Sequence, residues 1–134
     1  MSVTEIVQQA YEAFGEGDME KLASLMSDSY VGKLPESLPN GGTFNGPNDF
    51  IQNCLGKIPT LWSDLEIEPI QLYESGNTVF SHGKITAGGK TSETMHMSVI
   101  EDGKFVPHQS IKSFFKTYFF CCFSRKGLEL IRRL

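Results

Sequence analysis

The sequence predicts an α+β fold: a cone in which a strongly curved sheet, antiparallel or mixed, wraps around N-terminal helices. The start of the chain carries apolar residues at helical spacing, whereas the residues after Pro59 alternate with the period of a strand. Helices followed by an antiparallel meander are typical of a sheet covered by helices on one face. We expect residues 1–134 to form one domain. The interior of the cone is the expected ligand site.

Two amphipathic helices open the chain. In residues 3–14 apolar side chains recur at helical spacing, Ser2 or Thr4 can cap the start, and the glycines that follow can end the helix. Asp18 is placed to cap a second helix, whose apolar side chains end near Ser27. Each helix has one apolar side, so each is expected to pack against another surface.

The middle of the chain combines an extended segment, a loop and a third helix. Residues 30–34 are predicted to be extended, and residues 35–47, rich in Pro, Gly and Asn, are predicted to form an irregular loop. Pro47 suits the first position of a helix that runs from residue 48 to about residue 56.

Four strands are predicted after this helix. Each alternates in polarity and is bounded by turn residues, and the strands span residues 65–72, 77–87, 91–100 and 105 to about 120. Pro69 predicts an edge strand or a bulge, because proline cannot donate a hydrogen bond to a neighbouring strand. The Asp102-Gly103 turn predicts a two-residue hairpin that pairs Glu101 with Lys104.

The charge is unevenly distributed along the chain. Residues 1–111 hold six basic against fifteen acidic side chains, whereas residues 112–134 hold six basic side chains against Glu129 alone. The acidic body argues against nucleic acid as a partner, since the phosphate backbone needs a basic surface. No apolar run is long enough for a transmembrane helix, and the N-terminus does not resemble a secretory signal. We therefore expect a cytoplasmic protein.

The aromatic and basic segment 112–134 is atypical of the rest of the chain. Its aromatic side chains do not form one helical stripe, so association with a membrane is not expected. Packing within the sheet or at a subunit interface fits the composition better. The three cysteines, Cys54, Cys121 and Cys122, form neither a disulfide framework nor a metal-binding signature. They are expected to be reduced thiols in packing positions, and no metal is predicted.

Four segments, in order, resemble the nuclear-transport-factor-2-like superfamily and, within it, the SnoaL-like branch. They are residues 7–26, residues 41–46 with the short helix that follows, residues 61–65, and His96 followed by Asp102-Gly103-Lys104. The resemblance covers about residues 3–109. It implies a cystatin-like cone with an apolar pocket, commonly a homodimer formed through the outer face of the sheet.

The resemblance also implies a chemistry. Relatives of ketosteroid isomerase and the polyketide cyclases perform acid/base reactions on carbon next to a carbonyl, without a metal or an organic cofactor. Such a reaction needs a base within hydrogen-bond reach of the proton and a donor to the developing oxyanion. The fold also carries many binding proteins that are not enzymes, so the fold alone does not establish a reaction.

His96 is the first candidate site residue, because it matches the histidine that SnoaL-like cyclases place in their pocket. Thr94 and Ser98 alternate onto the same face of the strand. Counting back from the Asp-Gly turn sets His96 opposite Gln109, which predicts a polar pair inside the cone. The alternative is a histidine that is hydrogen-bonded on a sheet face and inert.

The position of His82 depends on the Gly88-Gly89 turn. A two-residue turn places His82 and His96 on opposite faces of the sheet, whereas a three-residue turn pairs the two histidines directly. Both registers stay open, and His82 is kept as a ligand-binding candidate. Two histidines without a third ligand do not make a metal site.

Three aromatic residues outside the sheet are candidates for the cavity or its rim: Tyr11, Phe14 and Trp62. The alternative is that they only fill the core. Tyr11 is also a candidate catalytic residue, since its phenol can donate a hydrogen bond to a ligand oxygen.

The segment that is expected to carry the catalytic acid contains none. SnoaL-like enzymes have an aspartate on the last strand, seven or eight positions beyond the turn, where residues 109–113 here read Gln-Ser-Ile-Lys-Ser. A glutamine cannot serve as a general base, and Lys112 would need strong desolvation to do so. Other carboxylates remain as alternatives: Asp28, Glu36 and, if the strand is bulged, Glu93.

The sequence therefore favours a SnoaL-like protein that binds a small, apolar, oxygen-bearing molecule. The first alternative is an isomerase or cyclase that uses His96 as acid/base and Tyr11 as donor. The second is a non-catalytic scaffold that recruits another protein through its outer sheet and its C-terminal segment.

Overall fold

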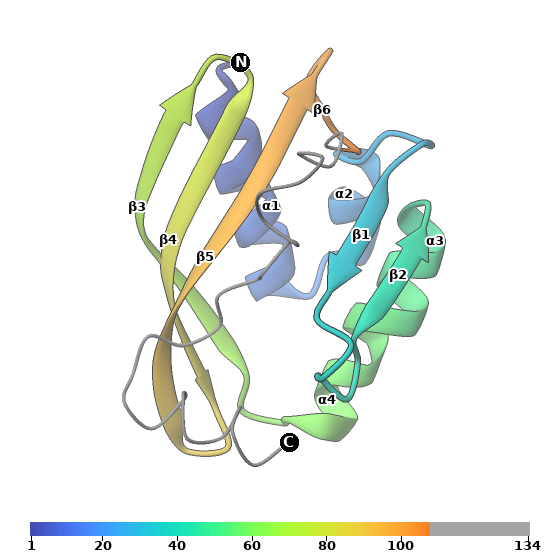
Figure 1. Cartoon of the computed structure of the whole chain (residues 1–134), viewed down its shortest axis with the longest axis vertical. Coiled ribbons are helices and arrows are strands. Elements are labelled where there is room, and N and C mark those ends of the chain that lie inside the picture. The colour runs from blue at the N-terminus through green and yellow to red at the C-terminus, as the bar shows by residue number, and fades with distance from the viewer. Residues whose placement is uncertain (108–134) are drawn as a thin grey trace.

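The computed structural model describes residues 1–107, and its architecture is shown in Figure 1. Several predictions concern residues 108–134 and lie outside the described residues. They are the long last strand beyond residue 107, the pairing of Gln109 with His96, the two cysteines Cys121 and Cys122, and the position of the segment 112–134.

The two N-terminal helices are α1 (Val3–Glu16) and α2 (Met19–Ser24). A capping box begins α1: Ser2 Oγ accepts from the Glu5 amide at 3.2 Å, and the Glu5 carboxylate accepts from the Ser2 amide at 2.7 Å. Gly17 ends α1 in the left-handed conformation, with φ of 72°. Both helices are confirmed, although α2 ends at Ser24, earlier than expected.

The predicted irregular loop is wrong in part. It contains strand β2 (Gly42–Asn45), which pairs antiparallel with β1 (Val31–Leu34). The local sequence does not predict this strand, because its neighbours are Gly, Pro and Asn. The strand is evident only from its pairing with β1 and from the burial of Phe44. Gly32 allows this hairpin to approach the next helix closely, since a Cβ there would lie 2.4 Å from the Phe50 ring.

The third helix is longer and less regular than predicted. It begins at Pro47 as expected and passes through four pieces, α3 (Pro47–Asp49), the π-helix η1 (Phe50–Cys54), the 3-10 helix η2 (Leu55–Lys57) and α4 (Ile58–Leu61). Pro59 does not end it, because Pro59 lies in the first turn of α4, where its missing N–H costs no hydrogen bond.

Cys54 anchors this helix to the preceding loop. Its side chain is fully buried as a free thiol, which agrees with the predicted packing role, and burial raises the pKa of the thiol to about 11. The buried Asn40 amide donates to the Cys54 carbonyl oxygen at 3.4 Å. The loop is thereby held against the helix that forms one wall of the cavity described below.

The main sheet is antiparallel, in the order β3-β4-β5-β6. Its strands are β3 (Glu66–Ser75), β4 (Thr78–Ala87), β5 (Lys90–Glu101) and β6 (Lys104–Val106). The Asp-Gly turn pairs Glu101 with Lys104, as predicted. The α+β prediction with a strongly curved sheet is confirmed, and Figure 1 shows α1 lying against one face of the curve.

Pro69 lies both on an edge strand and at a bulge, the two settings that its sequence position predicted. It lies on the edge strand β3, and the register with β4 shifts between Pro69 and Gln71. The bulge leaves Ile70 without a partner in the ladder. Beyond the bulge, the alternation of inward and outward side chains is shifted by one residue. As a result Ile67 and Leu72, five positions apart, pair with the inward-facing Ile85 and Ser81.

The core joins α1 to the inner face of the sheet. Ile6 and Val7 pack with Val79 and Ile100, and all four are at most 4% exposed. Burying side chains of this size stabilises the fold by about 1.5–3 kcal/mol each. Phe105 packs against this cluster and exchanges backbone hydrogen bonds with the segment after α2, which ties β6 to the helices.

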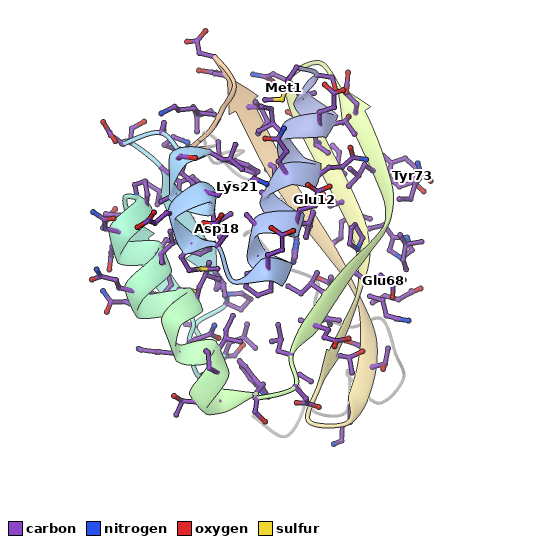
Figure 2. All side chains as sticks on the ribbon, turned by 180° about the vertical axis from the view of Figure 1, so that it is seen from behind. Met1, Glu12, Asp18, Lys21, Glu68 and Tyr73 are labelled. Atoms are coloured by element: carbon purple, nitrogen blue, oxygen red, sulfur yellow. The ribbon has the colours of Figure 1, made fainter. Side chains whose placement is uncertain are left out.

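The outer face of the sheet is exposed. Figure 2 shows the labelled side chains of Tyr73 and Glu68 pointing away from the helices. Tyr73 is 54% exposed and Phe80, on the same face, 38%. None of the helices within residues 1–107 has the length and apolar character needed to cross a membrane.

Candidate ligand-binding cavity

A cavity of about 810 Å³ lies between α1, the β1–β2 hairpin, the third helix and the inner face of the sheet. Its volume falls in the range of small-molecule sites, roughly 300–1,000 Å³. Apolar side chains dominate the wall, and six of the residues that line it are aromatic: Tyr11, Phe14, Tyr30, Phe50, Trp62 and Phe105. The wall therefore suits a molecule with a largely apolar body.

Two polar side chains meet inside this wall. Tyr11 reaches the cavity from α1 and His96 from β5, and the Tyr11 Oη and His96 Nδ1 atoms share a hydrogen bond of 2.7 Å. The two rings are stacked, with centroids 6.1 Å apart and planes 11° from parallel. The hydrogen bond and the stacking together fix the orientation of both rings.

Both members of the pair are neutral at physiological pH. Burial lowers the pKa of His96 to about 4, because the surrounding protein atoms remove most of the hydration that an imidazolium would need. Burial raises the pKa of the Tyr11 phenol, and the nearby Ser81 hydroxyl offsets part of that rise. The imidazole keeps a partly exposed surface, and this surface lines the cavity.

The neutral pair has two possible proton arrangements. If Tyr11 donates to Nδ1, the imidazole carries its hydrogen on Nε2; if Nδ1 donates to Tyr11, the phenol keeps a hydrogen to donate elsewhere. In either arrangement the pair combines a hydrogen-bond donor with oxygen or nitrogen lone pairs. It can therefore orient a ligand oxygen without a formal charge.

Ser81 is a neighbour of this pair that sequence reasoning missed. It lies directly opposite His96 in the β4–β5 register and is 1% exposed. Its Oγ makes no hydrogen bond of standard geometry within residues 1–107, although it lies near enough to Tyr11 to influence the phenol. Counting back from a two-residue Gly88-Gly89 turn would have identified it.

Besides Tyr11 and His96, three of the sequence candidates line the cavity: Phe14, Trp62 and Ser98. Thr94 lies on the inner face and is buried opposite Gly83, but it does not line the cavity. The ligand-binding roles of Phe14, Trp62 and Ser98 remain predictions, and Gln109 lies outside the described residues.

His82 does not line the cavity, and the register that would pair it directly with His96 is not the one observed. The Gly88-Gly89 turn has two residues and pairs Ala87 with Lys90, so His82 is opposite Met95 rather than His96. Its side chain lies on the outer face, where its Nε2 is 3.5 Å from the Glu93 carboxylate.

The alternative carboxylates do not reach the cavity. The β4–β5 ladder runs without a bulge, so Glu93 stays on the outer face. Asp28 and Glu36 are exposed and are not among the lining residues. Within residues 1–107 no carboxylate lines the cavity. The same part of the chain contains no cluster of three potential metal ligands. Within residues 1–107 the lining thus provides apolar contact, neutral hydrogen bonding and two lysines, Lys33 and Lys90, but no carboxylate base.

Comparisons with known proteins agree with this architecture. The family model described as the SnoaL-like domain matches residues 7–108. No curated protein matches the sequence.

Solved structures share the fold. An NTF2-like protein from Burkholderia thailandensis has a TM-score of 0.71 and 19% identity, over 80% of this chain and 87% of that one. A protein with a cystatin-like fold from Xanthomonas campestris has a TM-score of 0.70 and 24% identity, over 80% and 87%. TerC, crystallised with polyporic acid, has a TM-score of 0.69 and 25% identity, over 78% and 86%.

Proposed function

The chain belongs to the family of SnoaL-like domains, and from this premise we propose that its cavity binds a small, mainly apolar molecule that carries an oxygen atom. The observation that carries the proposal is the neutral, hydrogen-bonded pair Tyr11–His96 inside an aromatic cavity of about 810 Å³. An apolar wall with few oriented polar groups is the usual composition of a small-molecule site. The co-crystallisation of TerC with polyporic acid supports an aromatic, oxygen-bearing ligand.

Binding is favoured over turnover. A histidine whose pKa is lowered to about 4 is a weak base at neutral pH, because general bases work best when their pKa lies near the operating pH. Among the described residues no carboxylate lines the cavity that could take its place. The pair therefore serves as a fixed hydrogen-bonding group that orients the ligand.

The single tryptophan of the chain provides a direct test, because Trp62 lines the cavity. Polyporic acid, titrated into the protein, is expected to quench Trp62 fluorescence to saturation, with one site per chain by calorimetry. Ser92→Phe, which fills the cavity from the inner face of β5, is expected to abolish this site. Absence of saturable binding to the wild-type protein would count against the proposal for this ligand class.

A matched pair of histidine variants tests whether His96 is the polar group that contacts the ligand. His96→Ala removes one hydrogen-bonding group from the cavity and is expected to weaken binding about 3- to 10-fold, the value of one hydrogen bond. His82→Ala removes the same side chain from the outer face and is expected to leave affinity unchanged. Equal losses in the two variants would contradict the proposed role of the Tyr11–His96 pair.

The enzyme alternative rests on the same hydrogen bond, because a phenol held at 2.7 Å from an imidazole could stabilise an enolate. It predicts exchange of the proton next to the carbonyl of a cyclic ketone in deuterated water, lost in Tyr11→Phe and in His96→Ala. No exchange across a panel of cyclic ketones that bind would exclude this reaction.

A homodimer is a separate part of the proposal. The outer face of the sheet exposes Tyr73, Phe80 and Met95 within residues 1–107, and exposed apolar side chains that share one face suit an interface. Analytical ultracentrifugation is expected to show a dimer in the wild-type protein and a monomer after Phe80→Glu. A wild-type monomer at all concentrations would remove this part and leave the cavity proposal untouched.

A further inference from the structure

The charged side chains around the cavity are distributed in an unusual way. Residues 1–107 contain fifteen Asp or Glu and six Lys, so acidic side chains are the more abundant. Yet none of these acidic residues lines the cavity, whereas Lys33 and Lys90 both do. The charged side chains of residues 1–107 that line the cavity are thus both positive, in a chain whose net charge is −4.

The two lysines come from opposite walls. Lys33 lies on β1, two positions after Val31, which lines the same wall. Lys90 is the first residue of β5 and pairs with Ala87, another lining residue. Both lysines are exposed, so their ammonium groups stay hydrated at the rim rather than in the apolar interior.

The Asp64 carboxylate lies beside Lys90, on the amides of Gly88 and Gly89, but it forms no ion pair with that lysine. Within residues 1–107 neither Lys33 nor Lys90 forms an ion pair, whereas Lys84 on the outer face lies 3.1 Å from Glu68. A chain with net negative charge repels anions at a distance, and two lysines at the rim offset part of that repulsion locally. A positive rim favours an anionic ligand over a neutral one.

We infer that the ligand is an amphipathic anion, whose apolar body lies in the cavity and whose carboxylate or comparable acidic group stays at the rim near Lys33 and Lys90. This inference rests on the proposed ligand-binding function. Placing the acid at the rim avoids the large cost of moving a charge into an apolar interior. The neutral Tyr11–His96 pair then binds an uncharged oxygen of the same molecule.

A matched pair of probes separates this inference from the proposed function. Pyrenebutyrate and pyrenebutyramide share an apolar body and a carbonyl oxygen and differ in charge, and both report binding by energy transfer from Trp62. The acid is expected to bind the wild-type protein about 5- to 10-fold more tightly at low salt, from two exposed charge pairs. High salt is expected to remove most of this preference.

Three lysine variants identify the source of the preference. Lys33→Gln and Lys90→Gln are each expected to lower the affinity for pyrenebutyrate about 2- to 4-fold, and the double variant should bind the acid and the amide equally. Lys84→Gln makes the same change in net charge on the outer face and is expected to keep the preference. Thermal unfolding of each variant verifies that the fold is retained.

The possible outcomes are distinct. Equal binding of the acid and the amide to the wild-type protein overturns the inference and leaves the proposed function in place. An equal loss in Lys84→Gln also overturns it, because the preference would then come from net charge rather than from the rim. If neither probe binds, both the inference and the proposed apolar site fail.

Discussion

The two faces of β4 and β5 differ sharply in exposure, although their residues alternate along the same two strands. On the inner face, which lies against α1, Val79 and Ser81 are at most 1% exposed. Phe80 lies between them in the sequence, points to the outer face and is 38% exposed. One position along a strand separates a core residue from a surface residue, because the side-chain period of a strand is two. The register of this hairpin therefore decides which residues can form the site.

The two histidines make the same contrast in chemical terms. His96 faces inward, where burial lowers its pKa. Its Nδ1 atom shares a hydrogen bond of 2.7 Å with the Tyr11 hydroxyl. His82 faces outward and lies near the Glu93 carboxylate at 3.5 Å. Identical side chains on neighbouring strands thus have different surroundings. The environment supplied by the fold, rather than residue type, makes His96 a candidate site residue.

A carboxylate introduced on each face of β4 tests how differently the two faces are buried. Val79→Asp puts a carboxylate into a fully buried position and is expected to cost about 4 kcal/mol or more of unfolding free energy, a large share of the stability of a domain. Phe80→Asp makes the corresponding change outward and is expected to cost less than about 1 kcal/mol. Urea unfolding at low protein concentration measures both. Similar losses at the two positions would show that the register is not the one described.

The pH dependence of stability is expected to distinguish the two histidines. Because the pKa of His96 is about 4 in the folded protein against an ordinary 6.5, the unfolded chain binds a proton in this window that the folded chain does not. Stability is therefore expected to fall as the pH falls from about 6.5 to about 4, by about 1–3 kcal/mol. His96→Gln should flatten this dependence, and His82→Gln, on the outer face, is the matched control.

The measurement is urea unfolding at several pH values for the wild-type protein and the two variants. Carboxylates such as Asp49, whose pKa is lowered by hydrogen bonds from Asn53 and Asn45, contribute mainly at the acidic end and are common to all three proteins. If wild type and His96→Gln have the same slope above pH 4, burial of His96 is not the cause.

The smallest expected effect concerns the turn that sets the two faces. The Asp64 carboxylate accepts hydrogen bonds from the amides of Gly88 at 2.7 Å and Gly89 at 2.9 Å, and these bonds lower the pKa of Asp64. Asp64→Asn keeps one amide oxygen and is expected to speed hydrogen exchange at both glycine amides, with little change in melting temperature. Glu66→Gln, an equal charge change nearby, is the control. Unchanged exchange in Asp64→Asn would mean that the turn holds without this carboxylate.

Much of the fold could be predicted because its signals are local. The capping serine and the apolar spacing of α1, the Asp-Gly turn, and Pro69 at an edge bulge each involve a few consecutive residues. The failures have a common cause. Strand β2 exists because it pairs with β1, and no periodicity within its four residues reveals that pairing.

The candidate site was predictable only in part. His96 and Tyr11 were named separately, but a hydrogen bond between residues 85 positions apart depends on how α1 packs on the sheet. Ser81 could have been found once the turn length was known. Lys33 and Lys90 had no local signal, since a lysine on a short strand and a lysine after a turn are ordinary surface residues.

Caps, turns and alternation act between neighbours in the chain, and they were enough to predict the first two helices, the start of the third and the four strands of the main sheet. Packing between distant segments was needed to show which face of the sheet lines the cavity, that Tyr11 meets His96, and that two lysines rather than any carboxylate of residues 1–107 line the cavity. Those features depend on one residue of register at Gly88-Gly89 and on the packing of distant segments, which local chemistry leaves open.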